Sequence, residues 1–204
     1  MTVFLGVDSG SRTLGFGVLS DTPDSPDIHY IDSFFVKIKG KDIFDRIEFA
    51  RSQVEKICQK YNPDVVFIED IIAYMPKKSQ ASTIVSLTTY NRHLCNVLHQ
   101  HLKSKNGTKP ILLNVNSIRH TIKKAGEKKA VEKFDVPDVL SFHLKVQVPV
   151  YLDKKGKIRV ETYDAADGLA CCYAGILKQR NPKASKPKRK KKKCISKKPA
   201  PSLE

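Results

Sequence analysis

An apolar run close to the N-terminus ends on a single carboxylate, and this feature limits the folds open to the chain. Val3–Val7 is an unbroken apolar stretch, and Asp8 follows it directly. Such a run is typical of a strand buried on both faces of a sheet. Glycines between residues 10 and 17 are expected to allow a tight reversal into a second strand, Thr13–Leu19. Asp8 is therefore predicted at the mouth of a hairpin, where a ligand can approach it.

Two chemistries use a turn of this kind. The pair of segments Asp8–Ser11 and Gly15–Val18 resembles the strand end that carries a metal-binding carboxylate in RNase H-like nucleases. It also resembles the phosphate-binding loop of actin-like and sugar-kinase-like ATPases. The motif by itself leaves both open.

Three further segments are predicted to be strands of the same sheet. Ile28–Ile38 alternates partly in polarity, which favours a third, antiparallel strand at the edge. Val65–Ile68 is continuously apolar, which favours a parallel strand, and it too ends on carboxylates, Glu69 and Asp70. Pro110–Val115 is expected to form a short fifth strand.

Apolar residues at spacings of three and four predict two long helices between these strands. Asp42 is expected to cap the first helix, which ends before Pro63. The second helix, at about residues 79–102, has one apolar stripe with further apolar residues beside it. Packing on the sheet and contact with a second copy of the chain explain this stripe equally well.

The following residues are strongly basic until the last helix. Two basic helical segments are expected at residues 117–124 and 127–134, where the lysines line either a phosphate path or a solvated face. Val150–Thr162 is predicted to be a hairpin with a basic tip. A helix of small residues follows, opened by Asp164 and Asp167, and their spacing of three puts both carboxylates on one face.

The positive charge of the chain is concentrated at its C-terminal end. The 204 residues carry a formal net charge of +16, which favours a polyanionic partner. Arg180–Glu204 contains eleven Lys or Arg and one acid and has little apolar content, so it is predicted to be disordered. We expect one domain, residues 1–179, followed by a polybasic tail, residues 180–204. The basic run 187–193 fits a nuclear-import signal or a non-specific arm on nucleic acid.

Cysteine usage and hydropathy indicate the compartment. The five cysteines have no zinc-binding spacing and their number is odd, which favours reduced thiols inside the cell. The sequence shows no leader pattern and no apolar run near the ~20 residues that span a bilayer. We therefore expect a soluble intracellular protein with no membrane contact, nuclear if the basic run is an import signal and otherwise cytoplasmic.

Carboxylates from three elements are expected to meet at one edge of the sheet. Asp8 and Glu69 end two neighbouring strands, and Asp164 and Asp167 lie on the last helix. Four acids in one place repel one another, and hard divalent cations such as Mg²⁺ relieve that repulsion through oxygen ligands. Two such ions suit in-line hydrolysis of a phosphodiester.

The chain resembles the RuvC-type Holliday junction resolvases of the RNase H-like superfamily. The resemblance rests on GVDSGSRTLGFGV near the N-terminus, VVFIED at the predicted fourth strand and YDAADGLACCYA in the last helix. It implies an α/β, RNase H-like fold with a mixed five-stranded sheet and helices on both faces. The departures are the long segment 150–162 and the tail, which are compatible with a viral, phage or eukaryote-associated branch.

The resemblance also implies a function and a set of residues. Members are homodimers that resolve four-way DNA junctions by paired symmetric nicks, in recombination and repair, with two Mg²⁺ or Mn²⁺ ions and no small-molecule cofactor. It implies that the helix near 79–102 forms the dimer interface. The catalytic metal ligands would be Asp8, Glu69, Asp164 and Asp167, and the DNA contacts would come from Tyr74, Arg119, Lys124, Lys128 and Lys129.

Three other functions are alternatives to this one. A nuclease of the same fold that cuts other branched DNA or structured RNA shares the metal site and differs in substrate selection. An actin-like or sugar-kinase-like ATPase needs a second phosphate loop in a duplicated domain, for which the chain is too short. A catalytically silent DNA-binding module is disfavoured by the complete set of acids.

Overall fold

The centre of the molecule is one mixed sheet whose strands lie in the order β3-β2-β1-β4-β5. The computed structural model describes residues 1–22, 27–70, 81–123, 127 and 129–182. In these residues β1 pairs antiparallel with β2 and parallel with β4, β2 pairs antiparallel with β3, and β4 pairs parallel with β5. The bounds are Thr2–Ser9 for β1, Thr13–Asp21 for β2, Ile28–Lys37 for β3, Val65–Asp70 for β4 and Ile111–Asn114 for β5.

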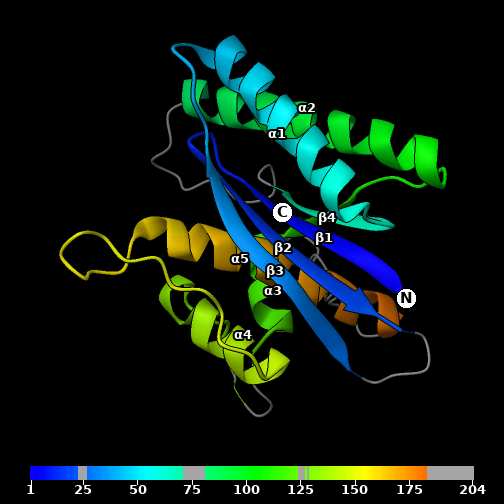
Figure 1. Cartoon of the computed structure of the whole chain (residues 1–204), viewed down its shortest axis with the longest axis vertical. Helices are drawn as coiled ribbons and strands as arrows, with labels where there is room; N and C mark the ends of the chain where they lie inside the picture. The colour runs from blue at the N-terminus through cyan, green and yellow to red at the C-terminus, as the bar shows by residue number, and fades with distance from the viewer. Residues whose placement is uncertain (23–26, 71–80, 124–126, 128, 183–204) are drawn as a thin grey trace, which may run out of the picture.

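Helices cover both faces of this sheet. On one face lie α1 (Ile43–Tyr61) and α2 (Ala81–Lys105), and on the other lies α5 (Val160–Arg180), with α3 (Val115–Thr121) and α4 (Val136–Leu144) packed outside it (Figure 1). The predicted fold is confirmed. No helix in the described part of the chain is long and apolar enough to cross a membrane.

Alternation along β1 explains why the sheet has two cores. Leu5 and Val7 point to the α1 and α2 side, whereas Phe4 belongs to the cluster around α5. Each strand residue therefore selects a face by its position in the sequence. The same alternation of side chains along a strand determines the face of the sheet to which each strand-end acid points.

Most elements form where the sequence predicts them. The Asp42 side chain caps α1 by accepting hydrogen bonds from the amides of Phe44 and Asp45, at 2.8 and 2.9 Å. The α1 helix ends at Asn62 in the left-handed conformation, just before Pro63.

Two predictions for the C-terminal half were wrong, and one helix was not predicted. The described residues of segment 127–134 are not α-helical, and only a 3₁₀ turn forms at Lys133–Asp135. Helix α4 was not predicted, although Pro137 near its start fits a first helical turn. The α5 helix begins at Val160, so the Val150–Thr162 hairpin is shorter than predicted and Asp164 and Asp167 lie beyond the first turn.

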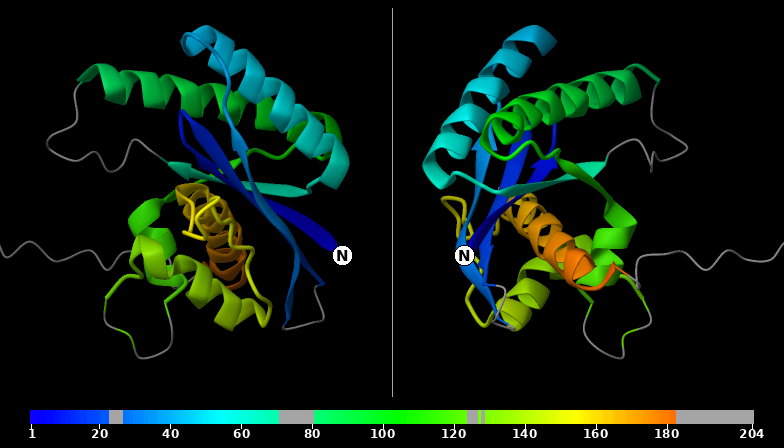
Figure 2. Two further views of the ribbon diagram at one scale, coloured as in Figure 1. Left: turned by 60° about the vertical axis from the view of Figure 1, so that its left-hand side comes forward. Right: turned by 90° about the vertical axis from the view of Figure 1, so that its right-hand side faces the viewer.

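The α5 helix lies directly on the backbone of β1 and β2. Gly6, Gly15 and Gly17 face it, and a Cβ at any of them would overlap backbone atoms of α5. The glycines at 15 and 17 therefore do not serve the turn, as the sequence suggested, but remove side chains from the helix–sheet contact. Both views in Figure 2 show α5 running across these strands, with α3 and α4 beyond it. This close approach sets the position of the acids on α5.

Gly17→Ala is expected to lower the free energy of unfolding by about 3 kcal/mol, since the new methyl group meets the Leu169 backbone rather than a movable side chain. Urea denaturation followed by circular dichroism measures this. Thr13→Ala, at the half-exposed start of the same strand, is the control and should cost less than about 1 kcal/mol. Equal costs for the two variants would contradict the proposed role of glycine.

Candidate active site

Asp8 and Glu69 come together because β1 and β4 are parallel neighbours. The last paired residues in their register are Val7 and Ile68, which point to the α1 and α2 side. The next residues, Asp8 and Glu69, therefore point to the opposite face, toward α5. Adjacent strands are about 4.8 Å apart, so the two carboxylates leave the sheet side by side.

The neighbouring acid, Asp70, belongs to the other face of the sheet. Its carboxylate lies 3.1 Å from the Arg92 guanidinium on α2. Although Glu69 and Asp70 are adjacent in the sequence, only Glu69 is on the side of Asp8.

The α5 helix adds two more carboxylates to this edge. Asp8 pairs across the β1–β2 ladder with Gly15, and the backbone of Asp164 rests on Gly15. Asp167, one turn further along α5, is buried with 8% of its surface exposed. All four predicted acids thus lie at one edge of the sheet, on its α5 side.

Burial and mutual repulsion disturb the ionisation of this cluster. Burial, followed by the charge of Asp167, raises the pKa of Glu69 to about 7. The pKa of Asp8 is raised well above its usual value by burial and then by the charges of Glu69 and Asp167. Burial also raises the pKa of Asp167, although Lys133 and Arg119 oppose the shift. The cluster therefore needs positive charge to be fully ionised at neutral pH.

Two basic side chains supply part of that charge. The Lys133 ammonium lies 3.2 Å from Asp164 Oδ1 and 3.4 Å from Asp167 Oδ2. The Arg119 guanidinium lies 3.9 Å from Asp167 Oδ1, and its buried Nε has no hydrogen-bond partner among the described residues. Sequence reasoning named Arg119 but missed Lys133, which was one of several lysines in a segment wrongly predicted to be helical.

A buried amide from α2 joins the ends of the two acid-bearing strands. Asn91 Nδ2 donates to Ser9 Oγ at 2.6 Å and to the Glu69 carbonyl oxygen at 2.9 Å. Both Asn91 and Ser9 have no exposed surface. This bridge fixes the backbone next to Asp8 and at Glu69. Nothing in the local sequence pattern predicts this bridge.

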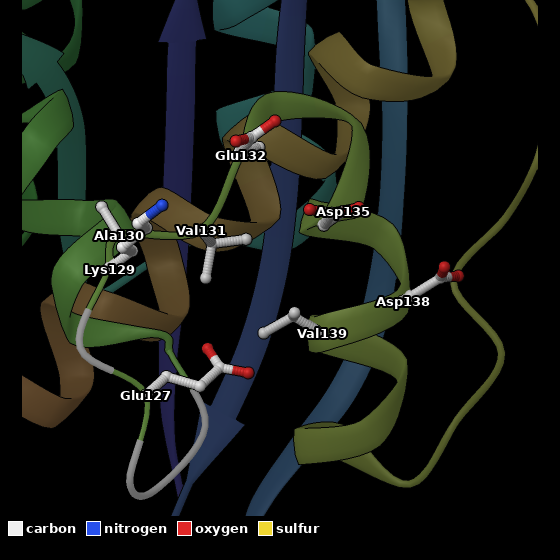
Figure 3. Close-up of a pocket in the computed structure, with 8 residues that line it drawn as sticks. All are labelled: Glu127, Lys129, Ala130, Val131, Glu132, Asp135, Asp138 and Val139. Atoms are coloured by element: carbon white, nitrogen blue, oxygen red, sulfur yellow. The ribbon is translucent and has the colours of Figure 1, made fainter.

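Among the remaining predicted DNA contacts, only Lys129 lies in the described part of the chain, and the pocket that it lines contains none of the four clustered acids. Tyr74, Lys124 and Lys128 lie outside the described residues. Lys129 lines a pocket of about 540 Å³ between residues 127–132 and the start of α4 (Figure 3). Four acids share this pocket, and they disfavour a phosphate there. They are Glu127, Glu132, Asp135 and Asp138.

The donor atoms at the cluster suit a hard cation. Carboxylate oxygens are the preferred ligands of Mg²⁺, and the negative charges of neighbouring acids add to burial in raising the pKa values of Asp8 and Glu69. In the part of the chain that the structure describes, however, no three Asp, Glu, His or Cys side chains are already arranged to hold a metal ion. The Lys133 ammonium instead lies against Asp164 and Asp167.

The sheet order and the helices on both faces define an RNase H-like fold. RuvC from Thermus thermophilus superposes with a TM-score of 0.62 at 15% identity, over 88% of this chain and 96% of that protein. The yeast mitochondrial Holliday junction resolvase Ydc2 gives a TM-score of 0.59 at 16% identity, over 89% and 80% of the two chains. At these identities the similarity shows the fold.

Sequence comparison identifies the family. The family model "Crossover junction endodeoxyribonuclease RuvC" matches residues 4–108, just over half of the chain. The chain belongs to the RuvC family. This membership sets aside the ATPase alternative.

Curated relatives from the same family match part of the chain. The RuvC of Actinobacillus succinogenes is 30% identical over 99 residues, which is 46% of this chain and 51% of that protein. The RuvC of Pseudomonas fluorescens strain SBW25 is 30% identical over 82 residues, which is 40% and 45% of the two chains. The chain spans about half the length of the curated relatives it matches.

The raised pKa of Glu69 predicts a pH-dependent loss of stability. A carboxyl with a higher pKa in the native state than in the unfolded state stabilises the fold below pH 4.5, and that contribution is lost as the pH rises through 7. Glu69→Gln should match the wild type near pH 4.5 and exceed its free energy of unfolding at pH 8 by up to about 3 kcal/mol.

Urea denaturation in EDTA between pH 4.5 and 8 measures this difference. Asp70→Asn is the control, because it removes the adjacent acid on the opposite face and loses the ion pair with Arg92. Parallel pH profiles for the wild type and Glu69→Gln would contradict the raised pKa of Glu69.

Proposed function

We propose that the chain is a structure-selective endonuclease that resolves four-way DNA junctions by Mg²⁺-dependent hydrolysis of phosphodiesters. One observation carries this proposal, namely that β1, β4 and α5 bring four carboxylates to one edge of the sheet in a member of the RuvC family. The curated relatives are named crossover junction endodeoxyribonucleases, and the fowlpox virus resolvase, at a TM-score of 0.50, was solved with Holliday junction DNA.

In this proposal Asp8, Glu69, Asp164 and Asp167 hold two divalent ions, Mg²⁺ or Mn²⁺. When bound, such ions promote the ionisation of water and offset charge on the leaving oxygen. The acids must be ionised to bind them, and Lys133 and Arg119 favour that ionised form of Asp167.

The two basic side chains also suit the substrate. The Arg119 Nε is a buried donor without a partner among the described residues, and it lies on the side chain that contacts Asp167. A phosphate oxygen brought to the acids would satisfy it. Lys133 would move from Asp164 and Asp167 toward the phosphate when metal ions take over their charge. Both residues would thus orient the strand rather than hold metal.

Cleavage assays on synthetic DNA test the proposal. Wild-type protein with Mg²⁺ should cut a four-way junction in preference to a linear duplex of the same sequence. Asp8→Asn should bind the junction but cut it about 100-fold or more slowly. Even mutation of a residue that only hydrogen-bonds to a metal ligand lowers activity about 10- to 100-fold, and Asp8 is proposed as a ligand itself. Asp70→Asn is the matched control and should keep most activity, because Asp70 points to the other face.

Two outcomes would overturn the assignment. Equal cutting of flaps, forks or structured RNA would favour the broader nuclease of the same fold. Equal loss of activity in Asp70→Asn and Asp8→Asn would show that cleavage does not depend specifically on the acid cluster.

The proposal includes a homodimer formed through α2, because paired nicks need two sites. From Tyr90 onward the apolar stripe of α2 is buried against the sheet and α1. Its N-terminal half differs, since Ile84 and Leu87 are partly exposed and Val85 is 63% exposed. This half offers an apolar surface to a second copy. The basic tail, outside the described residues, would add affinity for DNA or direct the protein to the nucleus.

Val85→Asp is expected to convert a dimer into a monomer, because a charge at the centre of an apolar contact loses its hydration. Sedimentation velocity with and without junction DNA measures the mass. Phe44→Asp, on α1 and 75% exposed, is the matched control and should leave the dimer intact. A wild-type protein that stays monomeric on the junction would exclude paired incision by this route.

A further inference from the structure

The segment between α4 and α5 forms a small, ordered hairpin that the proposed metal chemistry does not use. Leu152 and Ile158 form an antiparallel bridge, and Asp153 accepts hydrogen bonds from the amides of Lys155 and Lys157 at 2.8 and 2.9 Å. Gly156 takes a positive φ of 75°, which favours glycine and closes the turn. The turn is therefore held by its own hydrogen bonds.

The base of the hairpin is tied to the body of the protein. The Tyr151 amide donates to Thr162 Oγ1 at 2.9 Å, and the Tyr151 hydroxyl donates to the Ser33 carbonyl oxygen at 3.2 Å. The Tyr151 ring also packs edge-to-face on Phe35 of β3, with centroids 4.8 Å apart. These contacts join the hairpin to an edge strand and to the start of α5.

The hairpin lies next to the candidate active site. Helix α5 starts at Val160, directly after the hairpin, and Asp164 follows four residues later, about 6 Å along the helix axis. Figure 1 shows the segment in yellow, projecting beyond the N-terminal end of α5. A nucleic acid strand held at the acids would pass close to it.

The side chains of the hairpin combine exposed aliphatic groups with positive charge. Leu152 is 55% exposed and Ile158 is 52% exposed. Val150 and Val160 flank them and are also exposed, at 45% and 67%. The lysines at 154, 155 and 157 are exposed as well, and the single acid of the turn, Asp153, accepts hydrogen bonds from its backbone. Four exposed aliphatic side chains gathered on one short loop are typical of an interaction surface.

We propose that this hairpin, residues 150–160, is a second DNA-binding element that reads the branch point. The lysines contact phosphates of the arms, and Leu152 and Ile158 pack against base or sugar edges where stacking is interrupted. Apolar wedges flanked by basic residues are a recurrent way to hold distorted DNA. A protein partner fits less well, because lysine is depleted from protein interfaces. The inference rests on the proposed function and names a contact that selects the junction.

Two hairpin variants test the apolar contact with the branch point and the lysine contact with phosphates separately. Both are made in the Asp8→Asn background, which keeps the DNA intact, and both retain Tyr151 and Thr162 at the base. The apolar variant is Leu152→Ser with Ile158→Ser, and the charge variant is Lys154→Gln with Lys155→Gln and Lys157→Gln. Their matched controls are Phe44→Ser and the triple change Lys56→Gln, Lys103→Gln and Lys109→Gln, at exposed positions outside the hairpin.

Binding to a four-way junction with 2-aminopurine at the branch point gives the readout. The apolar variant should bind the junction about tenfold more weakly, bind linear duplex unchanged, and lose the fluorescence rise that reports unstacking. The charge variant should weaken both substrates and reduce the slope of log K against log salt by about 2 to 3. The controls should behave like the parent protein.

Junction affinity and fluorescence that equal those of the parent in both hairpin variants would overturn the inference. Thermal melts of the variants show whether the fold is kept, so a general loss of structure is recognised separately. A parent protein that does not prefer the junction over linear duplex would instead contradict the proposed function, whatever the hairpin variants do.

Discussion

The contact of α5 with bare strand backbone is the constraint on which the rest of the structure depends. Gly6, Gly15 and Gly17 leave no side chains between helix and sheet, so the helix comes within backbone contact of β1 and β2. Asp164 and Asp167 thereby reach the edge where Asp8 and Glu69 emerge. With ordinary side chains at these positions, the helix would stand further off and the acids would be separated. The geometry of the site is thus a result of backbone packing between α5 and the strands, in part directly beside the acids.

The same packing makes the site costly to the fold. Burial raises the pKa of Asp8, Glu69 and Asp167, so the ionised cluster opposes folding at neutral pH. Lys133 and Arg119 offset part of this cost from segments outside the sheet. On the opposite face Asp70 has a nearby guanidinium, Arg92, and lies away from the other acids. Two adjacent carboxylates therefore have opposite roles, one structural and one proposed for catalysis.

The sheet and the positions of Asp8 and Glu69 at strand ends could be predicted from the sequence, because both depend on local pattern. Continuous apolar runs marked β1 and β4, and a carboxylate after a buried strand marked Asp8 and Glu69. Lys133 and Asn91 were missed because their roles depend on contacts between segments far apart in the chain, which no spacing encodes. The start of α5 was missed because its N-cap, Arg159, has no side-chain capping bond. The role of Gly15 and Gly17 became clear only when α5 was seen on the sheet.

The Asn91 amide would connect dimer formation through α2 to the geometry of the acid cluster. It holds the tips of β1 and β4 together from α2, the helix proposed to meet a second copy. A small rotation of α2 would pull on Ser9 and on the Glu69 backbone, and so change the separation of the first two acids. Subunit pairing and cation affinity would then be thermodynamically linked through one uncharged side chain.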